Sequence, residues 1–143
     1  MLLCVAWVFS VIGGTMDRYL MVNNHGWKVK FVSPYNPELI DRTGSYTLGV
    51  TVPSEHTIYL SNDLYGRELI TVFIHEMTHT VLWEYDIISD IHRYSKSKYV
   101  IDMEELVCNI VANYGYLIFK SVYESLGGKA IFYIPTIIER MVS

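Results

Sequence analysis

Apolar residues along the 143-residue chain change from a strand-like to a helix-like spacing near its midpoint. Residues 27–32 (WKVKFV) alternate apolar and basic side chains, which predicts a half-buried strand. Residues 46–53 and 56–60 predict two further short strands, and Pro53-Ser54-Glu55 between them favours a hairpin turn. The first half of the chain is therefore expected to form a small sheet.

The second half of the chain contains the helical patterns. From about residue 64 to 83 apolar residues recur at helical spacing on most sides, which predicts a central, largely buried helix. The helix-capping residues Ser61-Asn62-Asp63 precede it. Residues 86–98 are polar and lack a sharp period, so they predict either a loop or a poorly packed helix.

A second long helix is predicted at about residues 103–126. Asp102 opens it, and Glu105 three residues later gives a capping-box-like start. Gly127-Gly128 ends it, and residues 130–142 form a final apolar element with Pro135 near a helix start. Strands followed by helices predict an α+β fold with a small, mainly antiparallel sheet and two long helices packed side by side.

Composition indicates a single globular domain, residues 1–143. Hydrophobic residues make up 51% and charged residues 18%, which is typical of a folded chain. The net charge is −4 and no run of Lys or Arg occurs, so direct nucleic-acid binding is not expected. The two cysteines, Cys4 and Cys108, cannot build a disulfide framework, which favours a reduced, cytoplasmic setting.

The apolar run at residues 2–14 leaves three alternatives open. It is a buried first helix or strand, a weak signal segment, or upstream translation from a misassigned start. In the last case Met16 or Met21 is the true first residue, and residues 1–15 lie outside the native domain. No Lys or Arg precedes the run and it is too short to span a bilayer, so no membrane association is expected.

The motif that indicates metal binding and catalysis is His75-Glu76-Met77-Thr78-His79, an HExxH sequence inside the first predicted helix. Histidines four residues apart project from the same helix face, so both imidazoles can reach one ion. Glu76 lies about 100° round the helix, where it can hold a metal-bound water. The motif predicts a Zn²⁺ site with His75 and His79 as ligands and Glu76 as general base.

A catalytic zinc commonly has a third protein ligand. No histidine follows at the HExxHxxGxxH spacing, so Glu104 and Glu105 on the second helix are the candidates. The stripe through Glu105 also carries Asn109 and Ala112, which leaves room for a metal. It therefore favours Glu105 as the ligand and Asn109 as a hydrogen-bonding partner of His75 or of the Glu105 carboxylate. Glu104 is then expected to be a solvated glutamate in the first turn of the helix.

The motif and the segment that follows resemble a known family. HEMTH followed by residues 105–112 (ELVCNIVA) resembles the ImmA/IrrE-like metallopeptidases, whose second motif reads approximately E-x-x-A-[ND]-x-F-A. Cys108 replaces the alanine and Val111 the phenylalanine. The strand at residues 56–60 resembles the edge strand of that family. The resemblance covers residues 46–117 and is shared by small HExxH proteins of phages and mobile elements.

The resemblance implies a minimal zincin-like domain with zinc-dependent endopeptidase activity. It implies His75, His79 and Glu105 as zinc ligands and Glu76 as catalytic base. Family members often cut helix-turn-helix repressors of mobile elements, so the implied partner is such a protein in the cytoplasm of a bacterial or phage-infected cell. SprT-like proteases are a second resemblance, but their third histidine and zinc ribbon are not evident in this sequence.

Two further features are expected of a peptidase. Residues 57–60, as an edge strand, would pair with an extended substrate. A tyrosine would donate to the oxyanion, and the sequence leaves the choice among Tyr85, Tyr94, Tyr99 and Tyr114 open. The alternative function is a non-catalytic, zinc-containing binding or inhibitory module of phage origin, and a metal-free α+β domain is the third possibility.

Overall fold

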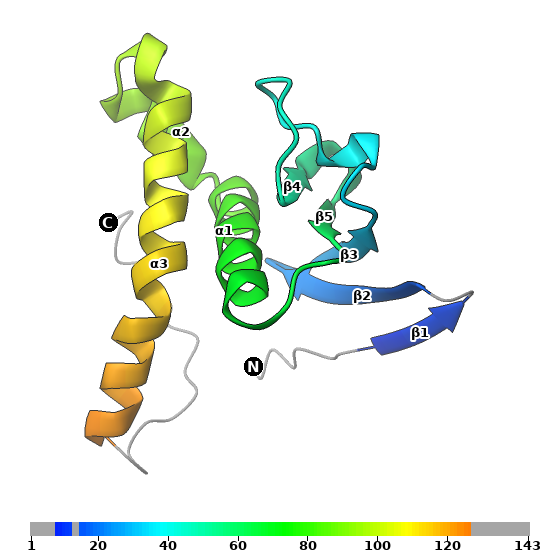
Figure 1. Cartoon of the computed structure of the whole chain (residues 1–143). Coiled ribbons are helices and arrows are strands. Elements are labelled where there is room, and N and C mark those ends of the chain that lie inside the picture. The colour runs from blue at the N-terminus through cyan, green and yellow to red at the C-terminus, as the bar shows by residue number, and fades with distance from the viewer. Residues whose placement is uncertain (1–7, 13–14, 127–143) are drawn as a thin grey trace.

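The computed structural model describes residues 8–12 and 15–126, in which strands precede helices. The strands are β1 (Val8–Ile12), β2 (Thr15–Val22), β3 (His25–Val32), β4 (Gly49–Val52) and β5 (Thr57–Ser61). The α-helices are α1 (Gly66–Glu84), α2 (Ile87–Tyr94) and α3 (Val100–Leu126). Figure 1 shows the strands on one side of α1 and α3 on the other. The predicted α+β class is therefore confirmed.

The sheet is mixed but mainly antiparallel, with the strand order β1-β2-β3-β5-β4. The first three strands form an antiparallel meander, β5 runs parallel to β3, and β4 runs antiparallel to β5. The β2–β3 hairpin turns at Asn23 and Asn24, which have φ values of 47° and 63°. Asparagine tolerates this left-handed region, so a two-residue turn fits here.

The position of β5 corrects one prediction. Residues 57–60 were expected to form an edge strand, but β5 lies between β3 and β4, and all five of its residues are buried. An interior strand covered on both faces has consecutive apolar residues without alternation, as Ile58, Tyr59 and Leu60 are in β5. The outer strand on this side is β4. The predicted hairpin of the two strands is confirmed, with a 3-10 turn at Pro53–Glu55 between them.

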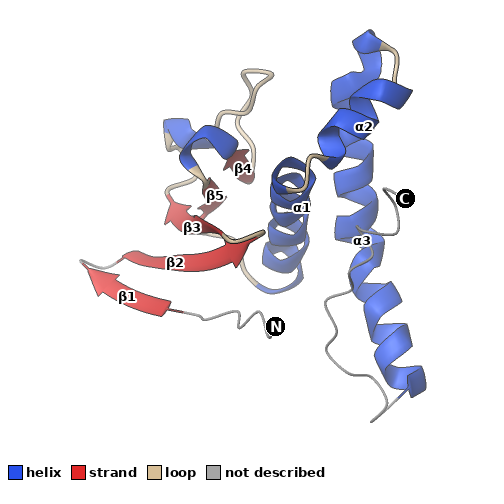
Figure 2. Ribbon diagram, turned by 180° about the vertical axis from the view of Figure 1, so that it is seen from behind, coloured by secondary structure: helices blue, strands red, loops and turns tan. Residues whose placement is uncertain are grey.

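The core lies between the sheet and α1. Trp27, Val29, Ile58 and Leu60 are buried at its centre, and side chains of α1 such as Phe73 pack against them. Helix α3 packs along α1 on the side away from the sheet, as Figures 1 and 2 both show, which confirms the predicted helix pair.

Helix α1 is less buried than its sequence predicted. Only Glu76, Thr80 and Leu82 are buried along it, and many of its other residues are half-buried. Strands of the sheet pack on one side of α1, and α2 and α3 pack on others. The pocket described below lies between α1, α3 and strand β4.

Both predicted helix starts were wrong by a few residues. The N-cap of α1 is Tyr65, without a side-chain hydrogen bond, rather than the 61–63 segment. Ser61 ends β5, and its hydroxyl instead donates to Asp63. Helix α3 begins at Val100 because a 3-10 turn at Ser97–Tyr99 runs directly into it. Asp102 therefore lies inside the helix and is not its cap.

The structure decides part of what was predicted for residues 86–98 and for the two ends of the chain. The polar residues 86–98 contain the short helix α2, none of whose residues is buried, which matches the predicted poorly packed helix. Residues 8–12 of the N-terminal apolar run form strand β1. The predicted helix end at Gly127-Gly128 and the element at residues 130–142 lie outside the described residues. In the described ranges no helix is long and apolar enough to cross a membrane.

Candidate metal centre

Two imidazoles meet on the face of α1 that is turned towards α3 and the pocket. His75 and His79 are one helical turn apart, and their Nε2 atoms lie 3.1 Å from each other. The ring centroids are 4.8 Å apart in an edge-to-face arrangement. Both side chains are mostly buried, with 19% and 12% exposed. The local helix spacing alone brings them together, as the motif predicted.

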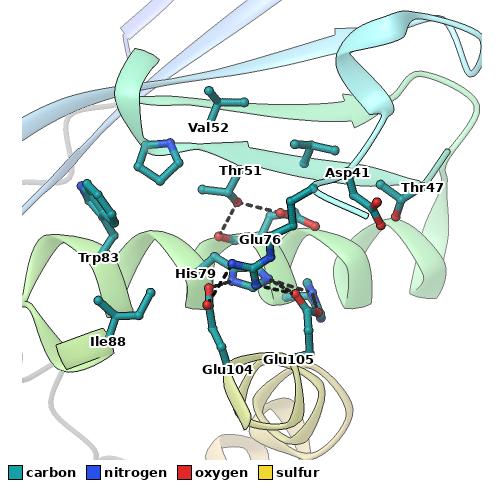
Figure 3. Close-up of a pocket in the computed structure, with 15 residues that line it drawn as sticks. Asp41, Thr47, Thr51, Val52, Glu76, His79, Trp83, Ile88, Glu104 and Glu105 are labelled. Carbon is teal, nitrogen blue, oxygen red and sulfur yellow. Dashed lines mark hydrogen bonds and ion pairs between the residues drawn. The ribbon is translucent and has the colours of Figure 1, made fainter. Parts of the chain in front are cut away.

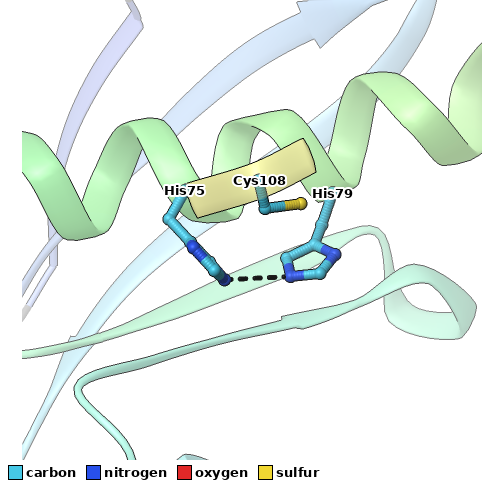
Figure 4. A group of neighbouring side chains, drawn as sticks. All are labelled: His75, His79 and Cys108. Atoms are coloured by element: carbon cyan, nitrogen blue, oxygen red, sulfur yellow. Dashed lines mark hydrogen bonds between the residues drawn. The ribbon is translucent and has the colours of Figure 1, made fainter. Parts of the chain in front are cut away.

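Cys108 of α3 completes a group that can hold a metal ion. The ligand atoms of His75, His79 and Cys108 all lie within 4.8 Å of one another (Figure 4). The thiol is fully buried, and burial raises its pKa although a hydrogen bond with His79 acts in the opposite direction. The sequence pattern had treated Cys108 only as a substitute for a small residue, so this neighbour of the histidines was missed.

Glu105 faces the same two imidazoles. Its carboxylate oxygens lie 3.2 Å from Nε2 of His75 and 3.4 Å from Nε2 of His79. Hydrogen bonds with these histidines hold the pKa of Glu105 well below its ordinary value. The structure thus brings the three predicted ligand residues together, and Figure 3 shows Glu105 of α3 facing His79 of α1.

Glu104 is also part of the centre, and its predicted solvated position is wrong. It is buried, and its Oε1 lies 2.8 Å from Nδ1 of His79. Its Oε2 accepts a hydrogen bond of 3.0 Å from Arg42, whose second nitrogen donates to Glu105 at 3.1 Å. Burial alone would raise the pKa of Glu104, but the bonds from His79 and Arg42 outweigh it and lower that pKa.

Glu76 points from α1 towards strand β4. Its side chain is almost fully buried, and the Thr51 hydroxyl lies 2.6 Å from its Oε2. Burial raises the pKa of Glu76, and the hydrogen bond from Thr51 offsets only part of this effect. Strand β4 approaches very closely here, because a Cβ added to Gly49 would lie 2.9 Å from Cγ of Glu76.

A pocket of about 360 Å³ opens over these groups. Strand β4 and the loop before it form one wall, and α1 and α3 form the other. Arg42 contributes the cationic group of this lining, and Trp83, Ile88 and Pro53 make its apolar part. The pocket therefore combines histidines, carboxylates and an arginine beside the outer strand of the sheet.

Several predicted residues do not join the centre. Asn109 is exposed one turn along α3 from Glu105, and it is its backbone carbonyl that accepts a hydrogen bond from Asn113. Asn109 was predicted to contact His75 or the Glu105 carboxylate, whereas the carboxylate that contacts a histidine ring from this part of α3 is Glu104, against His79. The described residues that line the pocket include none of the candidate tyrosines, which are Tyr85, Tyr94, Tyr99 and Tyr114.

Comparisons with protein-family models, with curated proteins and with solved structures found no match to this chain. A proposal about function therefore rests on the geometry of the site. This geometry establishes a possible metal-binding group formed by His75, His79 and Cys108, with carboxylates beside it in an open pocket.

Nothing in the sequence marked Arg42 or Thr51 as part of this centre, because they lie in a loop and a short strand far from the motif.

Proposed function

We propose that this chain is a zinc-dependent endopeptidase of the ImmA/IrrE-like kind, with His75, His79 and Glu105 as zinc ligands and Glu76 as general base. The spacing of the donor atoms supports this proposal most directly. The two Nε2 atoms and the Glu105 oxygens lie 3.1, 3.2 and 3.4 Å from one another. Donors bound to one tetrahedral zinc are about 3.3–3.6 Å apart, so the residues fit the ion.

The protonation states favour Glu105 over Cys108 as the third ligand. Metal ligands bind in their deprotonated form. A glutamate is ionised at neutral pH, whereas burial raises the pKa of the Cys108 thiol, which must lose its proton before it can bind. Glu105 is therefore the ligand that binds without losing a proton, and Cys108 is left as a hydrogen-bonding neighbour of His79.

Glu104 and Arg42 give the proposed ligands their orientation. A carboxylate on Nδ1 of a histidine fixes the ring and leaves Nε2 for the metal. Glu104 makes this contact with His79, and Arg42 holds Glu104 and Glu105 at a fixed separation. We assign both as positioning residues.

The proposed reaction is hydrolysis of a peptide bond. A zinc ion held by His75, His79 and Glu105 would supply a water of lowered pKa and would polarise the scissile carbonyl. Glu76 accepts the proton of the water while the water oxygen bonds to the carbonyl carbon. It then passes that proton to the amine nitrogen as the C–N bond breaks. The raised pKa of Glu76 suits this exchange because the carboxylate is more basic than an exposed glutamate.

Strand β4 is the proposed surface for an extended substrate. In the described part of the chain β4 pairs only with β5, so its outer edge has backbone groups free to pair with a peptide. The residues of β4 line the pocket beside Glu76. The substrate-pairing role predicted for residues 57–60 therefore moves to β4. The resemblance points to a helix-turn-helix repressor of a phage or mobile element as substrate, in the cytoplasm.

One observation favours a second function, a non-catalytic zinc-containing binding or inhibitory module. The His75, His79 and Cys108 group is of the kind that structural zinc sites use, in which cysteine is common. In such a module the zinc holds the helices together and no general base is needed. Glu76 distinguishes the two functions, since only the peptidase requires its carboxylate.

The test compares wild-type protein with Glu76→Gln in cells that co-express candidate repressors from the same genomic neighbourhood. We expect cleavage to fall by about 10³-fold or more, because base and zinc-water act as a unit, while zinc content and fold are kept. Glu68→Gln, the same change at an exposed position in the first turn of α1 and outside the pocket, is the matched control and should cleave normally. Full biological effect in Glu76→Gln would establish the binding module. Absence of tightly held transition metal in protein never exposed to a chelator would refute both.

A further inference from the structure

Helix α3 has a second apolar face, opposite the one that packs on α1. Towards α1 it presents Glu104, Cys108 and Ala112, all of which are buried. On the opposite face apolar residues recur at intervals of three, four, four and three positions, and about 100° of rotation per residue keeps them in one narrow stripe. The members of this α3 stripe are 40–59% exposed, and they are Met103, Leu106, Ile110, Tyr114 and Leu117.

The surroundings of the α3 stripe are those of a contact surface. Between Glu105 and Lys120 the sequence of α3 contains no charged residue. Figures 1 and 2 show α3 at the side of the fold away from the sheet, where it packs mainly on α1, α2 and the 3-10 turn before it. The stripe exposes about 500 Å² of apolar surface, a size at which a patch on a protein surface marks an interaction site.

The α3 stripe has the same spacing when it is followed from either end. Ile110 lies at its centre. Leu106 and Tyr114 lie four residues away on either side, and Met103 and Leu117 lie seven residues away. Two antiparallel copies of α3 related by a two-fold axis at Ile110 therefore bring each member against an apolar member of the other copy. A contact between identical chains must be self-complementary in this way, and residues four apart form a ridge that packs between helices.

We infer that a second copy of this chain covers the α3 stripe, so that the protein is a two-fold symmetric dimer with antiparallel α3 helices. The two stripes together bury about 1,000 Å², which reaches the lower limit of a specific interface. Beside the stripe Asn109 and Asn113 are exposed and uncharged, as residues at the rim of an interface commonly are. Glu104 and Glu105 project from the other side of α3, so the dimer leaves both pockets open.

The first experiment measures the mass of the full-length protein by sedimentation velocity. We expect dimers to predominate at about 100 µM. Ile110→Arg places two like charges on the two-fold axis, so we expect its dimer dissociation constant to rise by at least about 100-fold. Ile101→Arg is the matched control. Ile101 is 47% exposed against 49% for Ile110, but it lies about 180° round the same helix, so this variant should dimerise as the wild type does.

The second experiment tests the antiparallel arrangement by crosslinking, in a Cys4→Ser background. Ile110→Cys should form a disulfide between two copies when oxidised glutathione is added, because each residue on the axis faces its own copy. Met103→Cys should crosslink to Leu117→Cys when the two variants are mixed. Neither of these two should crosslink alone, since two copies of Met103 are then about 20 Å apart along the helices.

Two results would overturn the inference. One is a wild-type chain that stays monomeric at about 100 µM, which would mean that residues outside the described ranges or a different protein cover the stripe. The other is a folded Ile110→Arg protein, by circular dichroism, that dimerises as the wild type does. If Ile110→Arg fails to fold, the crosslinks decide, and their absence refutes the antiparallel pairing. No readout involves zinc or peptidase activity, so the proposed function is tested independently.

Discussion

Helix α1 contacts two groups that contain the same donors, two histidines and a carboxylate, and their settings differ. In the middle of the helix His75 and His79 come from α1 itself, and Glu105 comes from α3. At its end the helix supplies only Glu84, and both histidines come from the sheet side. The middle group opens into a pocket beside the outer strand β4. The donor set alone therefore does not indicate catalysis, which also needs room for a substrate.

Two glutamates of α1 show the same contrast in their pKa values. Both carboxylates are nearly buried. Burial raises the pKa of Glu76, and this effect outweighs the hydrogen bond from Thr51 and the charges of His79 and His75, which act in the opposite direction. Burial acts on Glu84 in the same direction, but the bonds from His25 and Trp27 outweigh it and lower that pKa. Glu76 is thereby suited to exchange a proton, and Glu84 is suited to remain ionised.

The largest expected effect concerns the third ligand of the middle group. Glu105→Gln removes a charged ligand, so we expect zinc affinity to fall by more than about 100-fold. Competition with a chromogenic chelator measures the change. Asn109→Ala, an exposed change one turn along the same helix, is the control and should leave affinity within about twofold. If Cys108→Ser weakens zinc more than Glu105→Gln does, the thiol is the ligand and the site is of the structural kind.

A smaller effect is expected where β4 meets the general base. Gly49→Ala places a Cβ 2.9 Å from Cγ of Glu76 and 3.0 Å from Cγ1 of Val72, so these side chains must move. Overpacking of this kind costs about 1–3 kcal/mol in the free energy of unfolding. Displacement of Glu76 should also slow cleavage by about 10-fold or more. Denaturant unfolding and the cleavage assay give the two values.

Gly26→Ala provides the matched control for that change. Gly26 also lies in a strand, but the nearest atom to its added Cβ is the Met21 sulfur at 3.9 Å, an ordinary contact. We expect its stability and cleavage rate to stay near those of the wild type. Equal losses in both variants would mean that β4 does not hold Glu76 in position.

The smallest expected effect belongs to the group at the end of α1. Glu84→Gln should lower the free energy of unfolding by about 1 kcal/mol at pH 7, measured with a chelator present, because it weakens charge-assisted hydrogen bonds. The folded-state pKa of Glu84 is depressed, so its stabilisation is present above the ordinary glutamate value of about 4.3. It is lost as the pH falls through the lower folded-state pKa. A wild-type-to-variant difference that does not shrink in acid would contradict the assigned ionisation.

The sequence by itself determined the features that depend on local spacing. The alternation in residues 27–32 and the hairpin of residues 46–60 appear as β3, β4 and β5. Likewise, the helical period of α1 places His75 and His79 on one face, with Nε2 atoms 3.1 Å apart. Within one helix or hairpin the direction of each side chain follows from the backbone geometry, so no knowledge of the rest of the fold was needed.

Only the tertiary structure decided what lies around those elements. It placed β5 inside the sheet and β4 at the edge, because the parallel pairing of β3 with β5 joins strands that are distant in the sequence. In the folded chain Glu104 contacts His79, and Arg42 donates hydrogen bonds to both Glu104 and Glu105. The tertiary structure also gathered His25, His56 and Glu84 from three elements. These contacts depend on how helices and sheet pack, which is the sum of many small contact energies and leaves no periodic signal in the chain.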